Sequence, residues 1–345
     1  MKAMVFRGVR DLRLEDVEKP QPRRKEVLVR VAYCGVCKTD IHIFTGAFPA
    51  KPPVILGHEF SGVVEELGED VKTLKRGDHV AVNPIVYCGE CKYCVQGRTN
   101  LCENAVVLGG AGEIILDGAY AEYVRVPEKN ALRIDPEVSL KHAAMTEPLA
   151  CVVHGIELID VKPGDRVVVI GAGPIGLMLA QMAKNSGSSK VLVMDLRDER
   201  LKVAEKVGVD ITVNPLREDP LRAVEEATQG EKADIVIEAV GSIKTVEDSF
   251  KYVKKGGKVL IFGVPPEGAP ARIIPFDIYF KEISVIGSYA VPAESFIKAA
   301  SIISGKRVDL DPLITEVYPL ERLREAFEKA EKGEGLKKLI EVRPS

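Results

Sequence analysis

Short apolar segments, bounded by glycine, proline or charged residues, recur through the first 150 residues of the chain. Clear examples are Val27-Leu28-Val29-Arg30-Val31, Gly62-Val63-Val64-Glu65 and His79-Val80-Ala81-Val82. Runs of this length, separated by turn residues, are typical of β-sandwiches and β-barrels. The pattern predicts a β-rich, barrel-like domain over residues 1–150.

From about residue 151 to residue 289, apolar strands instead alternate with helical stretches. The first strand, Arg166-Val167-Val168-Val169-Ile170, has no polar alternation, as expected when both faces of a sheet are covered. A helix is predicted over about Ile175 to Ser186, and further strands at Val191–Met194, Ile235–Glu238, Val259–Phe262 and Ile283–Ile286. This βαβ rhythm predicts an α/β domain with a doubly wound parallel sheet. The last strand, Ile283–Ile286, is the edge at which the sheet could continue into a second copy of the chain.

The last segment, residues 290–345, mixes a predicted helix, Leu320 to Lys332, with a terminal strand at Leu339 to Val342. A chain of 345 residues is too long for one ordinary core, so two domains are expected. We expect the last segment to return to the first domain. Residues 1–150 and 290–345 would then form one domain, and residues 151–289 would form an inserted second domain.

Composition excludes several classes of function. Hydrophobic residues make up 46% of the chain and charged residues 29%, as in globular proteins that dissolve in water. A net charge of −3 gives no reason to expect a nucleic acid as partner. The longest uncharged stretch, Val167 to Ala183, contains glycines and is short for a membrane span, so no membrane association is expected.

The cysteine content indicates the compartment. Seven cysteines follow an N-terminus without the apolar core of a signal peptide, which predicts a reducing, cytoplasmic location. Clustered thiols in such a compartment bind metals more often than they form disulfides. Asn and Gln are scarce while Lys, Arg and Glu are abundant, and this bias predicts a thermophilic source.

Four of the cysteines form the pattern C-x₂-C-x₂-C-x₇-C in a lobe at about residues 84–104. They are Cys88, Cys91, Cys94 and Cys102. Four thiolates can close a tetrahedral shell around Zn²⁺ and leave no position for a substrate, so this metal would be structural. An iron–sulfur cluster is the alternative, because thiolates hold those clusters too. A nucleic-acid-binding zinc finger is disfavoured, since no basic recognition helix follows.

The segment Gly171-Ala172-Gly173-Pro174-Ile175-Gly176 has the spacing G-x-G-x-x-G. Gly171 would allow a tight turn, Gly173 would let the backbone approach a pyrophosphate, and Gly176 would let the helix lie close to the strand. The following helix would present free N–H groups and its positive dipole end to the phosphates. Because the motif follows a strand and opens a helix, it predicts a dinucleotide site in which Pro174 and Ile175 also take part.

Asp195 ends the next predicted strand, at the position where a ribose diol would lie. Its carboxylate would accept hydrogen bonds from the ribose hydroxyls and repel a 2′-phosphate, which favours NAD over NADP. Arg197 and Arg200 are close in sequence and weaken this argument, so NADP stays open as an alternative. Arg200 is counted among the cofactor-binding candidates.

A second, open metal site needs about three protein ligands and a free position. The candidates are Cys37, His58, Glu59 and Glu147. Cys34 and Cys37 could instead form a redox pair, but the residues after Cys37 favour a metal site. Asp40 could accept a hydrogen bond from an imidazole ligand, and Thr39 could take a proton from a substrate.

Several motifs occur in one order along the chain. They are Cys37-Lys38-Thr39-Asp40-Ile41-His42, Gly57-His58-Glu59, the four-cysteine lobe, Thr146-Glu147-Pro148-Leu149 and the glycine motif. Over nearly its whole length the chain therefore resembles the zinc-dependent medium-chain alcohol dehydrogenases. The resemblance implies a GroES-like catalytic domain, a Rossmann cofactor domain and two Zn²⁺ ions per chain.

The resemblance also implies residue roles. Cys37 and His58 match catalytic zinc ligands, Thr39 and His42 match a proton relay, and Lys38 stands where a basic residue approaches the pyrophosphate. The family implies a homodimer or homotetramer.

The third zinc ligand separates the branches of this family. The alcohol dehydrogenases that use a second cysteine carry it about where this chain has Glu147, whereas Cys151 falls on the wrong part of the following helix. The chain is thus similar to the sorbitol, threonine and butanediol dehydrogenase branch, with Glu59 or Glu147 facing the metal.

The implied reaction is reversible hydride transfer between a polyol or secondary alcohol and NAD; threonine, another alcohol and NADP remain alternatives. Sorbitol dehydrogenases carry an arginine where this chain reads Gly287-Ser288-Tyr289-Ala290, so the substrate stays open. A zinc-free reductase and a dinucleotide-sensing protein without turnover are the rival functions. Neither would need Cys37, His58 and the Thr39–His42 pair together.

Overall fold

The computed structural model describes residues 1–343 and divides into two compact units. Unit 1 comprises Met1–Ala150 and the segment from Val291 onward, and unit 2 comprises Cys151–Ala290. The second boundary therefore lies one residue after the expected position. No helix within residues 1–343 has the length and the apolar composition that a membrane span requires.

Unit 1 is built mainly of short strands. Its strands are β1 (Lys2–Gly8), β2 (Asp11–Asp16), β3 (Glu26–Gly35), β4 (Val54–Ile55), β5 (Glu59–Leu67), β6 (His79–Val82), β7 (Ile85–Val86), β8 (Val106–Leu108), β9 (Ile115–Leu116), β10 (Tyr123–Pro127), β11 (Ala131–Arg133), β18 (Ile314–Pro319) and β19 (Lys337–Glu341). Its helices are α1 (Lys38–Thr45), α2 (Lys92–Val95), α3 (Leu140–Ala143), α10 (Ala293–Ser304) and α11 (Leu323–Glu331), with short 3₁₀ turns at Thr99–Leu101, Glu128–Asn130, Asp311–Leu313 and Leu320–Arg322. The predicted helix over Leu320 to Lys332 is thus a 3₁₀ turn followed by α11.

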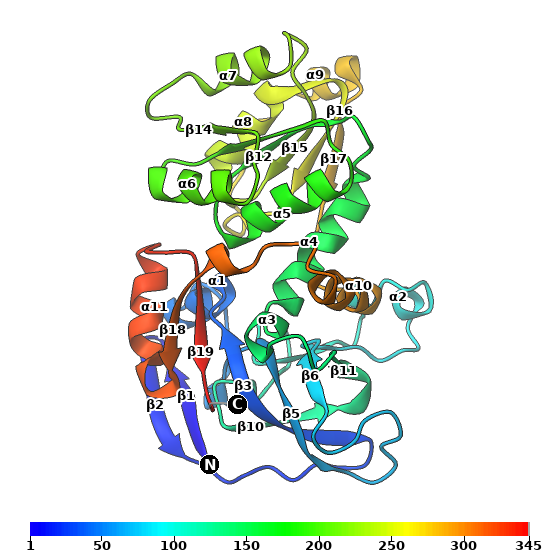
Figure 1. Cartoon of the computed structure of the whole chain (residues 1–345), viewed down its shortest axis with the longest axis vertical. Coiled ribbons are helices and arrows are strands. Elements are labelled where there is room, and N and C mark those ends of the chain that lie inside the picture. The colour runs from blue at the N-terminus through cyan, green and yellow to red at the C-terminus, as the bar shows by residue number, and fades with distance from the viewer. Residues whose placement is uncertain (344–345) are drawn as a thin grey trace. The chain divides into compact units, whose positions relative to one another are not determined.

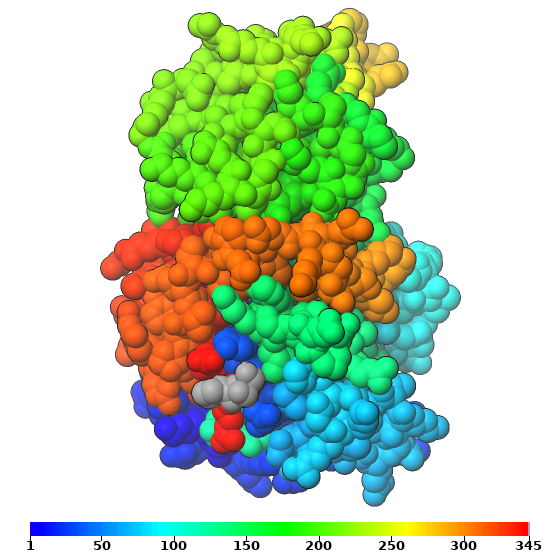
Figure 2. All heavy atoms as spheres, viewed as in Figure 1, coloured from blue at the N-terminus to red at the C-terminus, as the bar shows by residue number. Residues whose placement is uncertain are grey.

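The C-terminal strand completes the largest sheet of unit 1, whose order is β11-β6-β5-β3-β19-β18, with β10 also paired to β3. β19 runs antiparallel to β3 and pairs Leu339 with Gly35. This pairing brings the two ends of the chain together: the C-terminal residues (red) lie among the N-terminal residues (blue) in Figures 1 and 2. One apolar core, which includes Val29, Phe60 and Phe327, joins the two ends of the chain.

Unit 2 is an α/β layer structure. Its strands are β12 (Arg166–Ile170), β13 (Lys190–Met194), β14 (Ile211–Val213), β15 (Ala233–Glu238), β16 (Val253–Ile261) and β17 (Ser284–Gly287). Its helices are α5 (Pro174–Asn185), α6 (Asp198–Lys206), α7 (Pro220–Ala227), α8 (Ile243–Tyr252) and α9 (Pro275–Lys281), and α4 (Thr146–Ile159) begins in unit 1 and ends in unit 2.

The six strands of unit 2 form one parallel sheet in the order β14-β13-β12-β15-β16-β17. This is the doubly wound order in which the first strand lies at the centre and the chain winds outward on each side. Figure 1 shows α5 and α6 on one side of the sheet and α7, α8 and α9 on the other. Both faces are therefore covered, and the apolar run Val167 to Ile170 is buried as expected.

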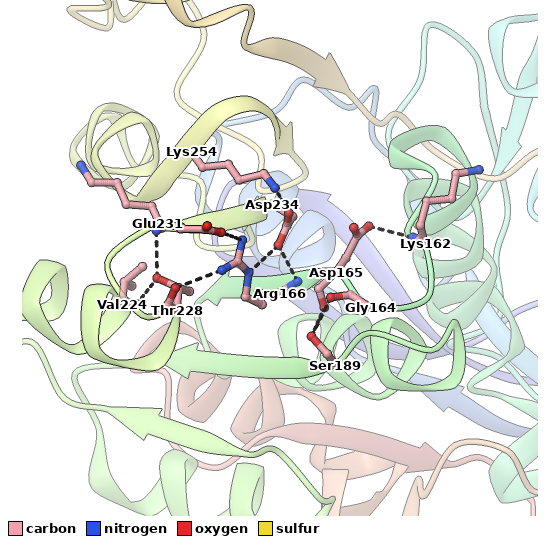
Figure 3. Close-up of polar contacts among 11 residues, drawn as sticks. Lys162, Gly164, Asp165, Arg166, Ser189, Val224, Thr228, Glu231, Asp234 and Lys254 are labelled. Carbon is pink, nitrogen blue, oxygen red and sulfur yellow. Dashed lines mark hydrogen bonds and ion pairs between the residues drawn. The ribbon is translucent and has the colours of Figure 1, made fainter.

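A network of charged side chains joins the amino ends of β12, β15 and β16 (Figure 3). Arg166 donates from its backbone N–H and from Nε to Asp234 Oδ2, at 2.9 and 2.8 Å. The guanidinium also donates to the carbonyl of Thr228 at 3.0 Å and to Glu231 at 2.8 Å. Lys254 forms an ion pair with the other oxygen of Asp234. Burial opposes the charge on Asp234, but Arg166 and Lys254 outweigh it and lower the pKa of this carboxyl to about 2.

We predict that Asp234→Asn lowers the free energy of unfolding at pH 7 by about 2 kcal/mol, because charge-assisted hydrogen bonds are lost. A carboxylate whose pKa is lowered by folding contributes its full stabilisation when the pH is above its pKa in the unfolded chain, which is 3.8 for Asp234. This contribution disappears as the pH falls through its pKa in the folded protein, about 2. Urea unfolding followed by circular dichroism should therefore show the two proteins converging between about pH 4 and pH 2. Glu226→Gln, which removes a solvent-exposed ion pair with Arg222, should have little effect at any pH; an equal loss in both variants would contradict the prediction.

Candidate metal centres and dinucleotide site

Cys37 occupies the N-cap position of α1, two residues after the end of β3. Its Sγ accepts a hydrogen bond from the backbone N–H of Thr39 at 3.5 Å, and Asp40 returns a bond by accepting from the N–H of Cys37 at 2.9 Å. This reciprocal arrangement is a capping box in which a thiol stands in place of the usual hydroxyl. Because the cap fixes Cys37, its sulfur has one direction relative to α1.

His58 follows a tight turn between β4 and β5. Gly57 has φ +98°, and a Cβ there would lie 2.9 Å from Cys34 Sγ and 3.0 Å from the Tyr120 ring, so a side chain does not fit. The imidazole of His58 is buried, and its Nδ1 lies 3.2 Å from Asp40 Oδ1. Neither atom has a hydrogen-bond partner among the described residues, so their attraction is electrostatic; a carboxylate on this side of the ring favours the tautomer in which Nε2 is free to bind a metal.

Glu59 begins β5 and completes a cluster of potential ligands. One ligand atom from each of Cys37, His58 and Glu59 lies within 4.8 Å of the other two. A thiolate, an imidazole and a carboxylate are a donor set that suits Zn²⁺ with an open position. Glu147, on the first turn of α4, does not belong to this set, although its charge acts on the neighbouring Lys337.

The cluster is electrostatically coupled. Burial disfavours the charged form of His58, but Asp40 and Cys37 outweigh it and hold the pKa of the imidazole well above its usual value. In the absence of a metal, a proton therefore neutralises the buried anions. A divalent cation would replace that proton, which is the usual exchange when a metal binds to histidine and cysteine.

Lys337 was missed by the sequence analysis. It begins β19, is 5% exposed, and its ammonium group forms an ion pair with Glu59 and donates to the carbonyl of Val36 at 3.1 Å. Burial lowers the pKa of Lys337, but Glu59 and Cys37 raise it above its usual value, so the group stays charged. A Cβ at Gly35 would overlap both Glu59 and Lys337, so the ion pair requires glycine there.

Three further predicted residues, Lys38, Thr39 and His42, lie on α1. Thr39 and His42 are three positions apart, so they share one side of the helix. The ring of His42 packs on Phe48 with centroids 4.8 Å apart. Burial and the neighbouring charge of Lys38 lower the pKa of His42 below its usual value, which favours the neutral imidazole. Lys38 is itself solvent-exposed at the first position of the helix.

The four-cysteine lobe brings its thiols together around α2. All four sulfurs, of Cys88, Cys91, Cys94 and Cys102, lie within 4.8 Å of one another. Backbone N–H groups point at them: Cys88 donates to Cys102 at 3.3 Å and Cys91 donates to Cys88 at 3.4 Å. N–H donors of this kind stabilise thiolates, and those of Glu90 and Cys91 lower the pKa of Cys88 to about 6. Burial instead raises the pKa of Cys94 to about 12, so a cation is needed to hold all four as thiolates.

The glycine motif forms the turn from β12 into α5. Gly171 has φ +106°, and a Cβ on Gly176 would lie 1.9 Å from the carbonyl oxygen of Gly171, so both positions require glycine. Gly173 is the N-cap of α5 and Pro174 is its first residue, followed by Ile175. No side chain caps this helix. The N-terminal N–H groups of α5 therefore remain available to a phosphate.

Asp195 follows β13 and contacts the glycine turn. Its Oδ2 accepts a hydrogen bond from the N–H of Ala172 at 2.8 Å, and its Oδ1 accepts one from the N–H of Arg197 at 3.0 Å. Each carboxylate oxygen keeps a further lone pair for a ligand. Arg200 Nη1 lies 3.7 Å from Asp195 Oδ2, so it partly balances the negative charge.

Comparison with known proteins identifies the family. Residues 23–136 match the family described as "Alcohol dehydrogenase GroES-like domain", and residues 174–305 match "Zinc-binding dehydrogenase". A sorbitol dehydrogenase from Halalkalibacterium halodurans is 35% identical to this chain, over 99% of both sequences. The chain belongs to the zinc-binding alcohol dehydrogenase family.

Other members of this family differ in substrate and cofactor. An L-threonine 3-dehydrogenase from Caldanaerobacter subterraneus subsp. tengcongensis is 34% identical over 92% of this chain and 91% of its own. A Sinorhizobium meliloti protein assigned as a zinc-binding dehydrogenase, and solved bound to NADP, superposes with a TM-score of 0.93 at 36% identity, covering 99% of both chains. The predicted family, the predicted pairing of a GroES-like domain with a Rossmann-type sheet, and the oxidoreductase class are therefore confirmed for this zinc-binding dehydrogenase.

We predict that Lys337→Met destabilises the metal-free dehydrogenase by about 3–5 kcal/mol, because it leaves Glu59 as an unpaired buried charge. Zinc should reduce that loss, since a cation beside Glu59 replaces the missing ammonium group. Urea unfolding with and without zinc measures both values. Lys338→Met is the control, because Lys338 is equally buried but pairs with Glu316 at 3.2 Å. It should destabilise the protein to the same extent in both conditions; identical behaviour of the two variants would refute a link between Lys337 and the metal site.

Proposed function

We propose that this dehydrogenase oxidises a polyol or another secondary alcohol reversibly with NAD, and that it binds two Zn²⁺ ions per chain. The observation that carries the proposal is the convergence of Cys37, His58 and Glu59 on one point, beside the relay candidates of α1. The four-cysteine lobe would hold the second ion, in a closed structural site.

Zinc bound at Cys37, His58 and Glu59 would supply a Lewis acid that lowers the pKa of an alcohol. The chain's own residues orient and balance that site. Asp40 favours one tautomer of His58. Lys337, on β19, balances the negative charge of Glu59. Glu147, whose charge also acts on Lys337, is the candidate to replace Glu59 as ligand.

Proton removal is assigned to α1. The hydroxyl of Thr39 would take the proton from the alcohol, and His42 would pass a proton to solvent from the same side of the helix. The lowered pKa of His42 keeps it able to accept a proton at neutral pH. Lys38, exposed at the start of α1, would approach the negative charge of the dinucleotide.

The choice of NAD rests on Asp195. NAD supplies the hydride acceptor, and Asp195 would accept hydrogen bonds from its adenosine ribose while Gly171, Gly173, Pro174, Ile175 and Gly176 form the phosphate cradle. A 2′-phosphate would meet the carboxylate at close range, although Arg200 and Arg197 lie nearby and could offset part of the repulsion. Because the similar structure from Sinorhizobium meliloti holds NADP, the preference for NAD over NADP has to be measured.

The polyol class is chosen over threonine by the wider set of relatives. Sorbitol dehydrogenase, D-xylulose reductase and D-arabitol-phosphate dehydrogenase relatives act on sugar alcohols or their ketoses, and each is 35% identical to this chain. We also propose a cytoplasmic location, because none of the seven cysteines, all within the described residues, forms a disulfide.

The function is tested with zinc-loaded protein and a panel of polyols, secondary alcohols and threonine, each with NAD and with NADP. We predict that a polyol with NAD gives the highest kcat/KM. Cys37→Ser should lose one of two zinc ions and reduce turnover roughly 1,000-fold, or about 4 kcal/mol of transition-state stabilisation. His42→Ala should slow turnover less and change its pH profile.

Cys151→Ser is the matched control, because Cys151 lies one turn after Glu147 on α4. It should keep both metal ions and full turnover. Loss of the catalytic zinc in Cys151→Ser, or full activity in Cys37→Ser, would remove the proposed ligand set.

We further propose that two copies associate through the edge of the unit 2 sheet. β17 is the last strand of that sheet, carries no charged residue, and leaves Val285 44% exposed. The neighbouring helix α9 exposes the aromatic rings of Phe276, Tyr279 and Phe280, of which the first and last stack with centroids 5.4 Å apart. An uncharged edge beside an apolar patch is suited to strand pairing with a second copy.

Val285→Lys should therefore convert a dimer into monomers, or a tetramer into smaller species, in sedimentation experiments at micromolar concentration. Val317→Lys is the control, because Val317 is 45% exposed on β18, an edge strand that Glu316 and Pro319 already protect. A monomeric wild-type protein would contradict the proposal outright.

A further inference from the structure

Tyr120 is a fully buried phenol whose hydroxyl lies next to the proposed catalytic metal site. The residue follows β9 in the chain, and its backbone N–H donates to the carbonyl of Leu56 at 2.9 Å. It is not among the proposed ligands, and the proton relay on α1 does not include it. A buried hydroxyl still needs a partner, because an unpaired one is costly in a dry environment.

The partner of the hydroxyl is the carboxylate that orients His58. Tyr120 Oη lies 2.8 Å from Asp40 Oδ2 and 3.0 Å from the carbonyl oxygen of Gly35. Burial and the charge of Asp40 raise the pKa of Tyr120 well above its usual value, so the phenol keeps its proton and acts as a donor. A bond to an ionised acceptor is the stronger kind, so Asp40 is the principal partner.

Asp40 is thereby held from several directions. Its Oδ2 accepts from the N–H of Cys37 and from Tyr120, while its Oδ1 lies 3.2 Å from His58 Nδ1. The two donors on Oδ2 determine the rotation of the carboxylate plane. That rotation sets where Oδ1 lies, and hence the orientation of the imidazole.

The ring of Tyr120 is held as firmly as its hydroxyl. It packs against the glycine turn before His58, where a Cβ on Gly57 would come within 3.0 Å of it. On another side it meets Phe327 of α11 edge-on, with centroids 5.8 Å apart, and Phe327 meets Phe44 of α1 at 5.5 Å. The phenol thus connects three elements: the His58 turn, α11 and the helix that carries Cys37.

We propose that Tyr120 is a positioning residue for the catalytic metal, acting through Asp40 on His58. The inference rests on the proposed zinc site. Outer partners of a ligating histidine typically change metal affinity or activity 10- to 100-fold, and Tyr120 acts one bond further out, so we expect an effect of roughly 3- to 10-fold.

The test uses Tyr120→Phe in full-length, zinc-loaded protein, because this change removes one oxygen atom and keeps the ring. Zinc release to a colorimetric chelator is followed over time, and the phase that is missing in Cys37→Ser is assigned to the catalytic ion. We expect that phase to be roughly 3- to 10-fold faster in Tyr120→Phe, with the release of the four-cysteine zinc unchanged.

Tyr318→Phe is the matched control. Tyr318 is also buried in unit 1, and its hydroxyl donates to a different carboxylate, Glu316, at 2.6 Å. It should lower the unfolding midpoint of metal-free protein much as Tyr120→Phe does, yet leave both zinc-release phases at the wild-type rate. Zinc release from Tyr120→Phe at the wild-type rate would overturn the inference, because the hydroxyl would then have no effect on the metal. Equal acceleration of both release phases would also overturn it, because the substitution would then have loosened the whole protein.

A double variant separates Tyr120 from the rest of the site. If Tyr120 acts through Asp40, adding Tyr120→Phe to Asp40→Asn should not accelerate zinc release further, so the two effects should not add. Fully additive effects would overturn the inference and leave the zinc site intact. If the wild-type protein bound no more zinc than Cys37→Ser does, the proposed function would be overturned, and this inference with it.

Discussion

The buried carboxylate of Asp40 is the constraint on which the proposed catalytic site depends. An isolated charge in a protein interior is very unfavourable, so it must be satisfied by donors or by opposite charge. Here the N–H of Cys37, the hydroxyl of Tyr120 and the imidazole of His58 surround it. The same carboxylate therefore closes the cap of α1, lies against the proposed metal ligand His58 and anchors a core aromatic residue. Its burial couples the local geometry of one helix to the chemistry of the site.

A second buried charge ties the two ends of the chain to the same place. Glu59 pairs with Lys337, which lies 278 positions later in the sequence. The ion pair forms only when β19 has joined β3, since Gly35 of β3 leaves the space that both side chains occupy. Unit 1 thus requires its C-terminal segment for the charge balance of Glu59 as well as for its core.

In unit 2, the residues that stabilise the sheet and the residues proposed to bind the dinucleotide lie at opposite ends of the strands. At the amino ends of the strands, Arg166, Asp234 and Lys254 form a half-buried charge network that joins β12 to β15 and β16. At the carboxyl ends lie the glycine turn and Asp195, where open α/β sheets bind their ligands. Glu238, fully buried at the end of β15, accepts from the N–H groups of Val240 and Gly241 and shapes the loop that packs against Gly171.

The sequence by itself determined the elements whose signal is local. The apolar run before G-x-G-x-x-G, the four-cysteine spacing and the motif from Cys37 to His42 depend on neighbours within a few residues, so family and fold class could be predicted from them. The central strands were also found, although β14 and the division of the C-terminal helix were not, because short elements carry little periodicity. Only the tertiary structure brings a ligand atom of Glu59 within 4.8 Å of Cys37 and His58, and places Lys337 and Tyr120 beside this cluster. The contacts of Tyr120 with Asp40 and of Lys337 with Glu59 link residues 80 and 278 positions apart, and the burial that makes them strong exists only after the chain has folded.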